Sequence, residues 1–175
     1  MATHEASPEA RPGWLTRQFF KVPVQMYRLG LGRRLEGKFL TLTTTGRRTG
    51  RARTVALDYV EEEGLIYVFA GYGTQSNWYR NVLAHPRVTI RVGARRLHGV
   101  ARPIEDAAER CRLVGALHKA ALRGAHGPPR PVRWLMKRLG ILDYEASLNQ
   151  AVATAERVPA VEIAPTGDIN TKEQR

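Results

Sequence analysis

The chain of 175 residues has one cysteine, Cys111, and no apolar run near 18 residues. A single cysteine excludes a disulfide within the chain and fits a reducing compartment. Without a long apolar run the sequence predicts no membrane-spanning helix. The acidic, polar first residues lack the apolar stretch of a secretion signal. We therefore expect a cytoplasmic location.

Motifs for metals and for nucleotide phosphates are also missing. The five histidines show no ligand spacing, so no metal site is predicted. The glycine-containing segment 46–50 is not followed by the Gly-Lys-Ser/Thr of a P-loop. Its glycines lie between two predicted strands, which excludes a Rossmann fingerprint.

Positive charge, by contrast, is abundant. The net charge is +12, and 23 of the 28 basic residues are arginines. From Arg28 to Arg53 there are eight basic residues and one acid, Glu36. The electrostatic field of such a segment attracts nucleic acid, anionic lipid or a polyanionic small molecule. The charge alone does not indicate which of the three is the ligand.

The length favours one domain, which we expect over residues 13–165. Residues 1–12 are predicted to be disordered and residues 166–175 to form a flexible tail. The domain should begin with a helical segment over 14–36, interrupted at Pro23.

Apolar and aromatic residues recur at helix-like spacing in 14–31, with Arg17, Lys21 and Arg28 between them, and this leaves two interpretations. The segment is a helix that caps the core, or an interfacial helix that makes peripheral contact with the inner face of a membrane.

Alternating or continuous apolar runs predict about six strands, mostly antiparallel, joined by short connections. The strands are expected at 38–45, 53–60, 65–70, 88–92, 96–102 and 158–163. Helices are expected at 76–84, with Ser76 as the N-cap, at 105–122 and at 132–139. This mainly β, α+β pattern is typical of a small barrel with flanking helices.

Two short blocks carry the chemistry. The first, Thr43–Arg53, holds four arginines, two glycines and several hydroxyls just after a strand. Guanidinium groups and closely approaching backbone N–H groups suit a phosphorylated anion, although a solvated basic turn is the alternative. In the second block, 78–86, Trp78 and Asn81 share one helical face. They either pack against the barrel or face a planar ligand.

In this order the two blocks resemble the deazaflavin-dependent nitroreductase family of actinobacteria. The matching residues are Thr44-Thr45-Gly46-Arg47-Arg48-Thr49-Gly50 with Arg53, then Trp78-Tyr79, Asn81-Val82 and Pro86. The resemblance covers about residues 38–102 and implies a split β-barrel. Members bind coenzyme F-420, an 8-hydroxy-5-deazaflavin with a phosphorylated, polyglutamylated tail. Its reduced form donates hydride to quinones, nitroaromatics or similar electrophiles.

The resemblance also implies a cofactor site. Residues that grip the tail would be Arg47, Arg48, Thr49 and Arg53. Residues beside the ring would be Thr54, Val55, Ala56, Leu57 and Asp58. The loop near the phosphate and the ring would be Phe69, Ala70, Gly71 and Tyr72, and Trp78 and Asn81 would close the pocket. The chain departs from the family at Gly71-Tyr72, where many members carry Ser-Lys. No catalytic residue can be named, and Tyr72, Tyr79 and Tyr144 are candidate proton donors.

Three functions follow from these features. The leading one is an F-420-dependent reductase acting on a small-molecule electron acceptor, with FMN as the less favoured cofactor. The second is a carrier that binds F-420 without turnover. The third is a basic binder of nucleic acid or membrane. Nucleic acid is not expected, because Phe39 and Tyr59 are too few to form a stacking face. The acceptor and the oligomeric state stay open.

Overall fold

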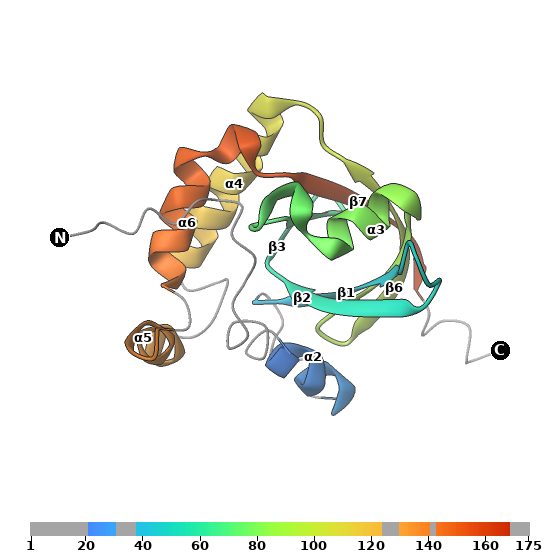
Figure 1. Cartoon of the computed structure of the whole chain (residues 1–175), viewed down its shortest axis with the longest axis horizontal. Helices are drawn as coiled ribbons and strands as arrows, with labels where there is room; N and C mark the ends of the chain where they lie inside the picture. Colours follow the sequence, from blue (N-terminus) through green and yellow to red (C-terminus); the bar gives the residue numbers. More distant parts are fainter. Residues whose placement is uncertain (1–20, 31–37, 124–129, 141–142, 169–175) are drawn as a thin grey trace.

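The computed structural model describes residues 21–30, 38–123, 130–140 and 143–168. Figure 1 shows a curled sheet with helices around it. Its seven strands within the described residues are β1 (Leu40–Thr45), β2 (Ala52–Leu57), β3 (Tyr59–Glu62), β4 (Leu65–Phe69), β5 (Arg87–Val92), β6 (Arg95–Pro103) and β7 (Ala160–Asp168). All pairings are antiparallel, in the order β2-β1-β5-β6-β7-β4-β3. The α+β split-barrel class is confirmed.

The curl of the sheet follows from a single residue, Asp58. It alone separates β2 from β3, yet these strands lie at opposite ends of the strand order. In a flat sheet six spacings of about 4.8 Å would hold the two edges roughly 29 Å apart. Leu57 and Tyr59 can be at most about 7 Å apart along the chain. The sheet therefore curls until its two edges meet at Asp58.

The prediction of one strand over 53–60 was wrong, because β2 and β3 lie there as two strands. The sheet has seven strands within the described residues, where about six were expected. Strand β2 pairs with β1, with Leu57 opposite Leu40. After Asp58, β3 pairs with β4 instead, with Tyr59 opposite Val68.

Strand β7 is longer than the predicted 158–163. Its last residues pair with the start of β6, with His98 opposite Gly167 and Leu97 opposite Asp168. The first three residues of the predicted tail, 166–168, are therefore part of the sheet. The predicted disordered segment 1–12 and the remainder of the tail lie outside the described residues.

Five α-helices lie within the described residues: α2 (Lys21–Arg28), α3 (Asn77–Ala84), α4 (Ala107–Leu122), α5 (Arg130–Arg138) and α6 (Tyr144–Ala153). Short 3₁₀ turns, η2 (Gly73–Gln75) and η3 (Ala155–Arg157), precede α3 and β7. Helix α6 was not predicted. Its N-cap is Asp143, whose carboxylate accepts a hydrogen bond from the Ala146 backbone N–H.

Two hydrophobic clusters lie on the two faces of the sheet. The inner one joins alternate residues of the strands to Val82 of α3, with Trp78 and Tyr79 packed against it. Figure 1 shows α3 within the curve of the sheet. The outer cluster joins Tyr67 of β4 to Leu113 and Leu117 of α4.

Helix α2 covers a separate part of the outer surface. Its Tyr27 is buried, donates a hydrogen bond to the Phe39 carbonyl at 2.7 Å and accepts one from the Gly93 N–H at 3.1 Å. Pro23 lies in the first turn, where a proline costs the helix no hydrogen bond. Val22 and Leu29 remain exposed on the other side. The described part of 14–31 thus caps the core, while the rest of that segment lies outside the described residues.

Candidate functional site

The first block forms a tight turn between β1 and β2. The Gly46 N–H donates to the Arg51 carbonyl at 2.9 Å, and the Gly50 N–H donates to the Gly46 carbonyl at 2.8 Å. Gly50 has a φ of 66°, in the left-handed region that favours glycine. A Cβ on Gly46 would lie 3.0 Å from the Arg51 carbonyl oxygen. The two glycines therefore fix the path of the turn and with it the directions of its arginines.

Asn81 links this turn to helix α3. Its buried Oδ1 accepts hydrogen bonds from the Arg47 backbone N–H and from Arg47 Nη1, both at 3.2 Å. Its Nδ2 donates to Thr44 Oγ1 at 3.2 Å. Arg47 also reaches Asn77 Oδ1 at 3.4 Å. The two sequence blocks are thus joined directly, and Asn81 serves mainly to hold the turn against the helix.

Three further arginines of the turn, Arg48, Arg51 and Arg53, are exposed. The ion pairs found among the described residues involve Arg95, Arg112 and Lys137, and none involves the turn. Arg53 is opposite Thr44 in the register, so its side chain starts on the face of the sheet that faces α3. The turn therefore presents several guanidinium groups without a carboxylate partner in the described part of the chain.

The residues proposed beside the ring divide between the faces of β2. Val55 and Leu57 pack against the inner cluster, as does Trp78. Thr54 lies on the opposite face, where its hydroxyl is 2.9 Å from that of Thr43. Ala56 shares that face and is buried. Only alternate side chains of 54–57 can therefore line one wall, and Val55 and Leu57 are on the wall shared with Trp78.

The loop after β4 brings the second set of predicted residues to the end of the barrel. Ala70 donates its N–H to the Pro159 carbonyl at 2.8 Å, which ties the loop to the start of β7. Phe69 packs into the outer cluster, away from Trp78. Tyr72 is half-buried, and burial raises the pKa of its phenol. Its hydroxyl therefore stays protonated throughout the neutral range.

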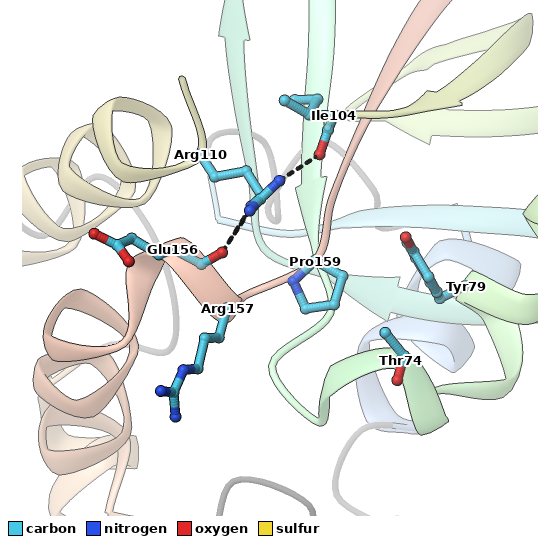
Figure 2. A pocket seen from close by; sticks show the side chains of 7 residues that line it. All are labelled: Thr74, Tyr79, Ile104, Arg110, Glu156, Arg157 and Pro159. Atoms are coloured by element: carbon cyan, nitrogen blue, oxygen red, sulfur yellow. Dashed lines mark hydrogen bonds between the residues drawn. The ribbon is translucent and has the colours of Figure 1, made fainter. Parts of the chain in front are cut away.

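A cavity of about 200 Å³ adjoins this loop. Figure 2 shows Tyr79 and Thr74 on one side and Arg110 and Glu156 on the other, with Pro159 between them. The guanidinium of Arg110 donates to the Ile104 carbonyl at 2.9 Å and to the Glu156 carbonyl at 2.6 Å. Arg110 is consequently a structural residue of this wall, and Tyr79 lines the cavity on the opposite side.

Some contributors were missed by the sequence analysis. Asn77 precedes Asn81 by one helical turn, so the spacing could have identified it as a second partner for Arg47. Thr44 was not assigned a role, although it completes the contacts of Asn81. Arg80 holds the loop before α3 by donating to the Thr74 carbonyl at 3.0 Å. Of the candidate proton donors, Tyr144 begins α6, and its side chain is outside the described part.

A family model described as F420H(2)-dependent quinone reductase matches residues 17–123, a stretch that contains the turn, the loop after β4 and α3. The chain belongs to this family. Membership confirms the predicted resemblance, the oxidoreductase class and F-420 as the cofactor. It does not favour the carrier function.

Individual relatives agree with this family. The F420H(2)-dependent quinone reductase Rv1261c of Mycobacterium tuberculosis is 33% identical over an aligned region that covers 53% of this chain and 70% of that protein. Among solved structures, a conserved hypothetical protein of Mycobacterium tuberculosis, Rv2991, superposes with a TM-score of 0.51 at 18% identity. That superposition covers 75% of this chain and 74% of the other, and it shows the same fold.

The described residues fit the cofactor of the F420H(2)-dependent quinone reductase family. The exposed guanidinium groups of Arg48, Arg51 and Arg53 match a phosphorylated, polyglutamylated tail. Ser76, the N-cap of α3, makes no side-chain capping bond, so the first backbone N–H groups of this helix receive no acceptor from it. Across the described ranges no group of three or more His, Cys, Asp and Glu is placed to hold a metal. No helix there has the length and apolarity needed to cross a bilayer.

Proposed function

We propose that this chain takes hydride from reduced F-420 and delivers it to a quinone, with nitroaromatics as further acceptors. The observation that carries the proposal is the β1–β2 turn: its exposed arginines lack carboxylate partners among the described residues, and Asn81 locks it to α3. An anionic tail supplies the countercharge that this cluster needs.

The proposed binding site divides into a charged and an apolar part. Arg48, Arg51 and Arg53 would hold the tail, and Thr49 would add a hydroxyl donor. Arg47 is already engaged with Asn77 and Asn81, so its part is to position the turn. The ring would lie against the inner wall that includes Val55 and Trp78. When bound in its reduced form, the cofactor supplies the hydride.

Reduction of a quinone to a hydroquinone consumes a proton besides the hydride, and we take the phenols of Tyr72 and Tyr79 as the candidate donors. Burial raises the pKa of Tyr72, and its phenol carries a proton at neutral pH. Tyr79 lines the cavity beside Pro159, whose carbonyl also binds the loop of Tyr72. We place the acceptor in this cavity, with a phenol returning to its starting state by taking a proton from solvent.

The binding part of the proposal is tested with Arg48→Gln and Arg53→Gln together. Charge-assisted hydrogen bonds contribute about 1.5–3 kcal/mol each, so the pair should weaken F-420 binding by at least about a hundredfold. Fluorescence titration of the cofactor measures it. The matched control is Arg87→Gln with Arg96→Gln, two exposed arginines on other strands. Equal affinity of the two double variants would show that the site is misassigned.

The catalytic part is tested by the oxidation of reduced F-420 with menadione and with a nitroaromatic. Turnover is expected. For Tyr72→Phe and for Tyr79→Phe, the fold-decrease in the turnover rate should be larger than the fold-decrease in the affinity for F-420. Tight binding without turnover of any acceptor would favour the carrier function instead.

A cytoplasmic location, with peripheral contact of residues 14–31 at the inner membrane face, is part of the same proposal. Quinones reside in lipid, and Val22 of α2 and Leu29, which directly follows α2, are exposed. Vesicle sedimentation of Val22→Ser with Leu29→Ser tests this contact.

A further inference from the structure

A long part of the chain carries positive charge alone. Residues 110–142 contain eight Lys and Arg and no Asp or Glu. The stretch runs through most of α4 and all of α5. It continues past residue 123, where the match to the family model ends. Arg112 and Lys137 form ion pairs with Glu62 and Asp143, and Arg110 donates to backbone carbonyls. The exposed cations of the stretch that form no ion pair among the described residues are Lys119, Arg123 and Arg138.

Exposed apolar side chains gather in the same two helices. Eight large hydrophobic residues are exposed in the described structure, and four of them lie at the end of α4, in α5 or directly after α5. They are Leu122, Trp134, Leu135 and Leu139, exposed by 63%, 63%, 48% and 58%. A cluster of exposed apolar residues on a basic element marks an interaction surface rather than scattered surface hydrophobics.

Helix α5 is fixed with one side toward the protein. Met136 is fully buried. Arg133 is half-buried, and its Nη2 donates to the Ala121 carbonyl at 3.2 Å, which anchors α5 to the C-terminal turn of α4. Trp134 is on the outer side, with the guanidinium carbon of Arg138 5.6 Å from its ring centroid. The exposed tryptophan is thus held in place and flanked by a cation.

Charge is distributed unevenly along α4. Glu105, Asp106 and Glu109 lie at its N-terminal end. Lys119 and Arg123 lie at the other end, about 24 Å away for 16 residues. In Figure 1 the N-terminal end of α4 is at the top, whereas α5 and α2 are both at the lower side. The exposed apolar residues of α5 therefore lie on the side of the molecule away from the acidic N-terminal end of α4.

We propose that α5 and the last turn of α4 form a docking surface for a bilayer containing anionic phospholipid. Cationic side chains attract the headgroups, Trp134 takes the position that tryptophan prefers at the headgroup boundary, and Leu135 and Leu139 enter the acyl region. This surface is separate from residues 14–31 and does not depend on the proposed function.

A lipid surface fits better than single-stranded nucleic acid. Nucleic acid needs several aromatic rings for successive bases, and Trp134 is the only aromatic residue on α5. Exposed leucines contribute nothing to phosphate binding, whereas they increase the apolar area that a membrane buries.

The 175-residue chain is sedimented with vesicles of phosphatidylcholine, alone or mixed with phosphatidylglycerol. Binding is expected only to the mixed vesicles, and added salt should release the protein. Trp134→Ser with Leu139→Ser should partition about tenfold more weakly, because binding scales with buried apolar area. Arg138→Gln should cost about fivefold, the effect of one cation near an anionic surface. These side chains are exposed, so circular dichroism should show an unchanged fold.

The control is Leu83→Ser with Val152→Ser, which removes two exposed apolar side chains from other helices and should bind as the wild type does. Tryptophan fluorescence should shift to the blue on anionic vesicles, and Trp134→Phe should make the shift smaller. Normal binding by the Trp134 and Leu139 double variant would overturn the proposal. So would a failure of the wild type to bind, or binding to an oligonucleotide instead of to vesicles. If Val22→Ser with Leu29→Ser lost vesicle binding while Trp134→Ser with Leu139→Ser kept it, the membrane contact would belong to the α2 segment and not to α5.

Discussion

Replacing Asn81 with leucine should show how much stability the joint between α3 and the β1–β2 turn provides. The change keeps a side chain of similar size and removes three hydrogen bonds of 3.2 Å, two to Arg47 and one to Thr44. Each bond contributes about 1 kcal/mol, so Asn81→Leu should lower the free energy of unfolding by about 3 kcal/mol. For a domain of this size that corresponds to a fall in Tm of roughly 6–12 °C.

Urea and thermal unfolding followed by circular dichroism measure this difference. Asn77→Leu is the matched control, because Asn77 is on the same helix and accepts from the same arginine. It is exposed, and its bonds are longer, at 3.4 Å. We expect it to cost at most about 0.5 kcal/mol. If the two variants differ by less than about 1 kcal/mol, Asn81 does not join the two blocks as described. The looser turn of Asn81→Leu should also bind F-420 more weakly than Asn77→Leu does.

Three further perturbations probe the fold. Gly99→Ala places a Cβ 2.8 Å from Ile163 Cγ2 and should cost about 1–3 kcal/mol by urea unfolding, since β6 and β7 would have to separate. Tyr27→Phe leaves the buried Gly93 N–H without its acceptor and should cost about 1–3 kcal/mol, and an unchanged Tm would contradict the anchoring of α2. Burial raises the pKa of Tyr72, so the folded state holds its proton where the unfolded state has lost it, and stability should fall as the pH rises above 10. Tyr72→Phe should flatten that alkaline decline.

The sequence allowed β1, β4 and α3 to be predicted to within two residues, because their patterns are local. The break at Asp58 was not predictable, since a single polar residue in an alternating strand normally points to solvent. Helix α6 has little apolar periodicity, although Asp143 was a readable N-cap signal. The order of the two blocks indicated a shared site, but the contact of Arg47 with Asn81 spans 34 positions and only the fold reveals it.

The central place of β7 has a consequence for how this protein is made. Strands β3 and β4 reach the rest of the sheet only through β7, with Ile66 opposite Ile163 about a hundred residues later. The edges of β4 and β6 that pair with β7 therefore keep unpaired backbone N–H and C=O groups until β7 has left the ribosome. Such non-local pairing slows folding and exposes strand edges to aggregation. Synthesis of this chain should accordingly depend on chaperones more than its size suggests, and any truncation before residue 160 should yield two separate sheets rather than a shortened barrel.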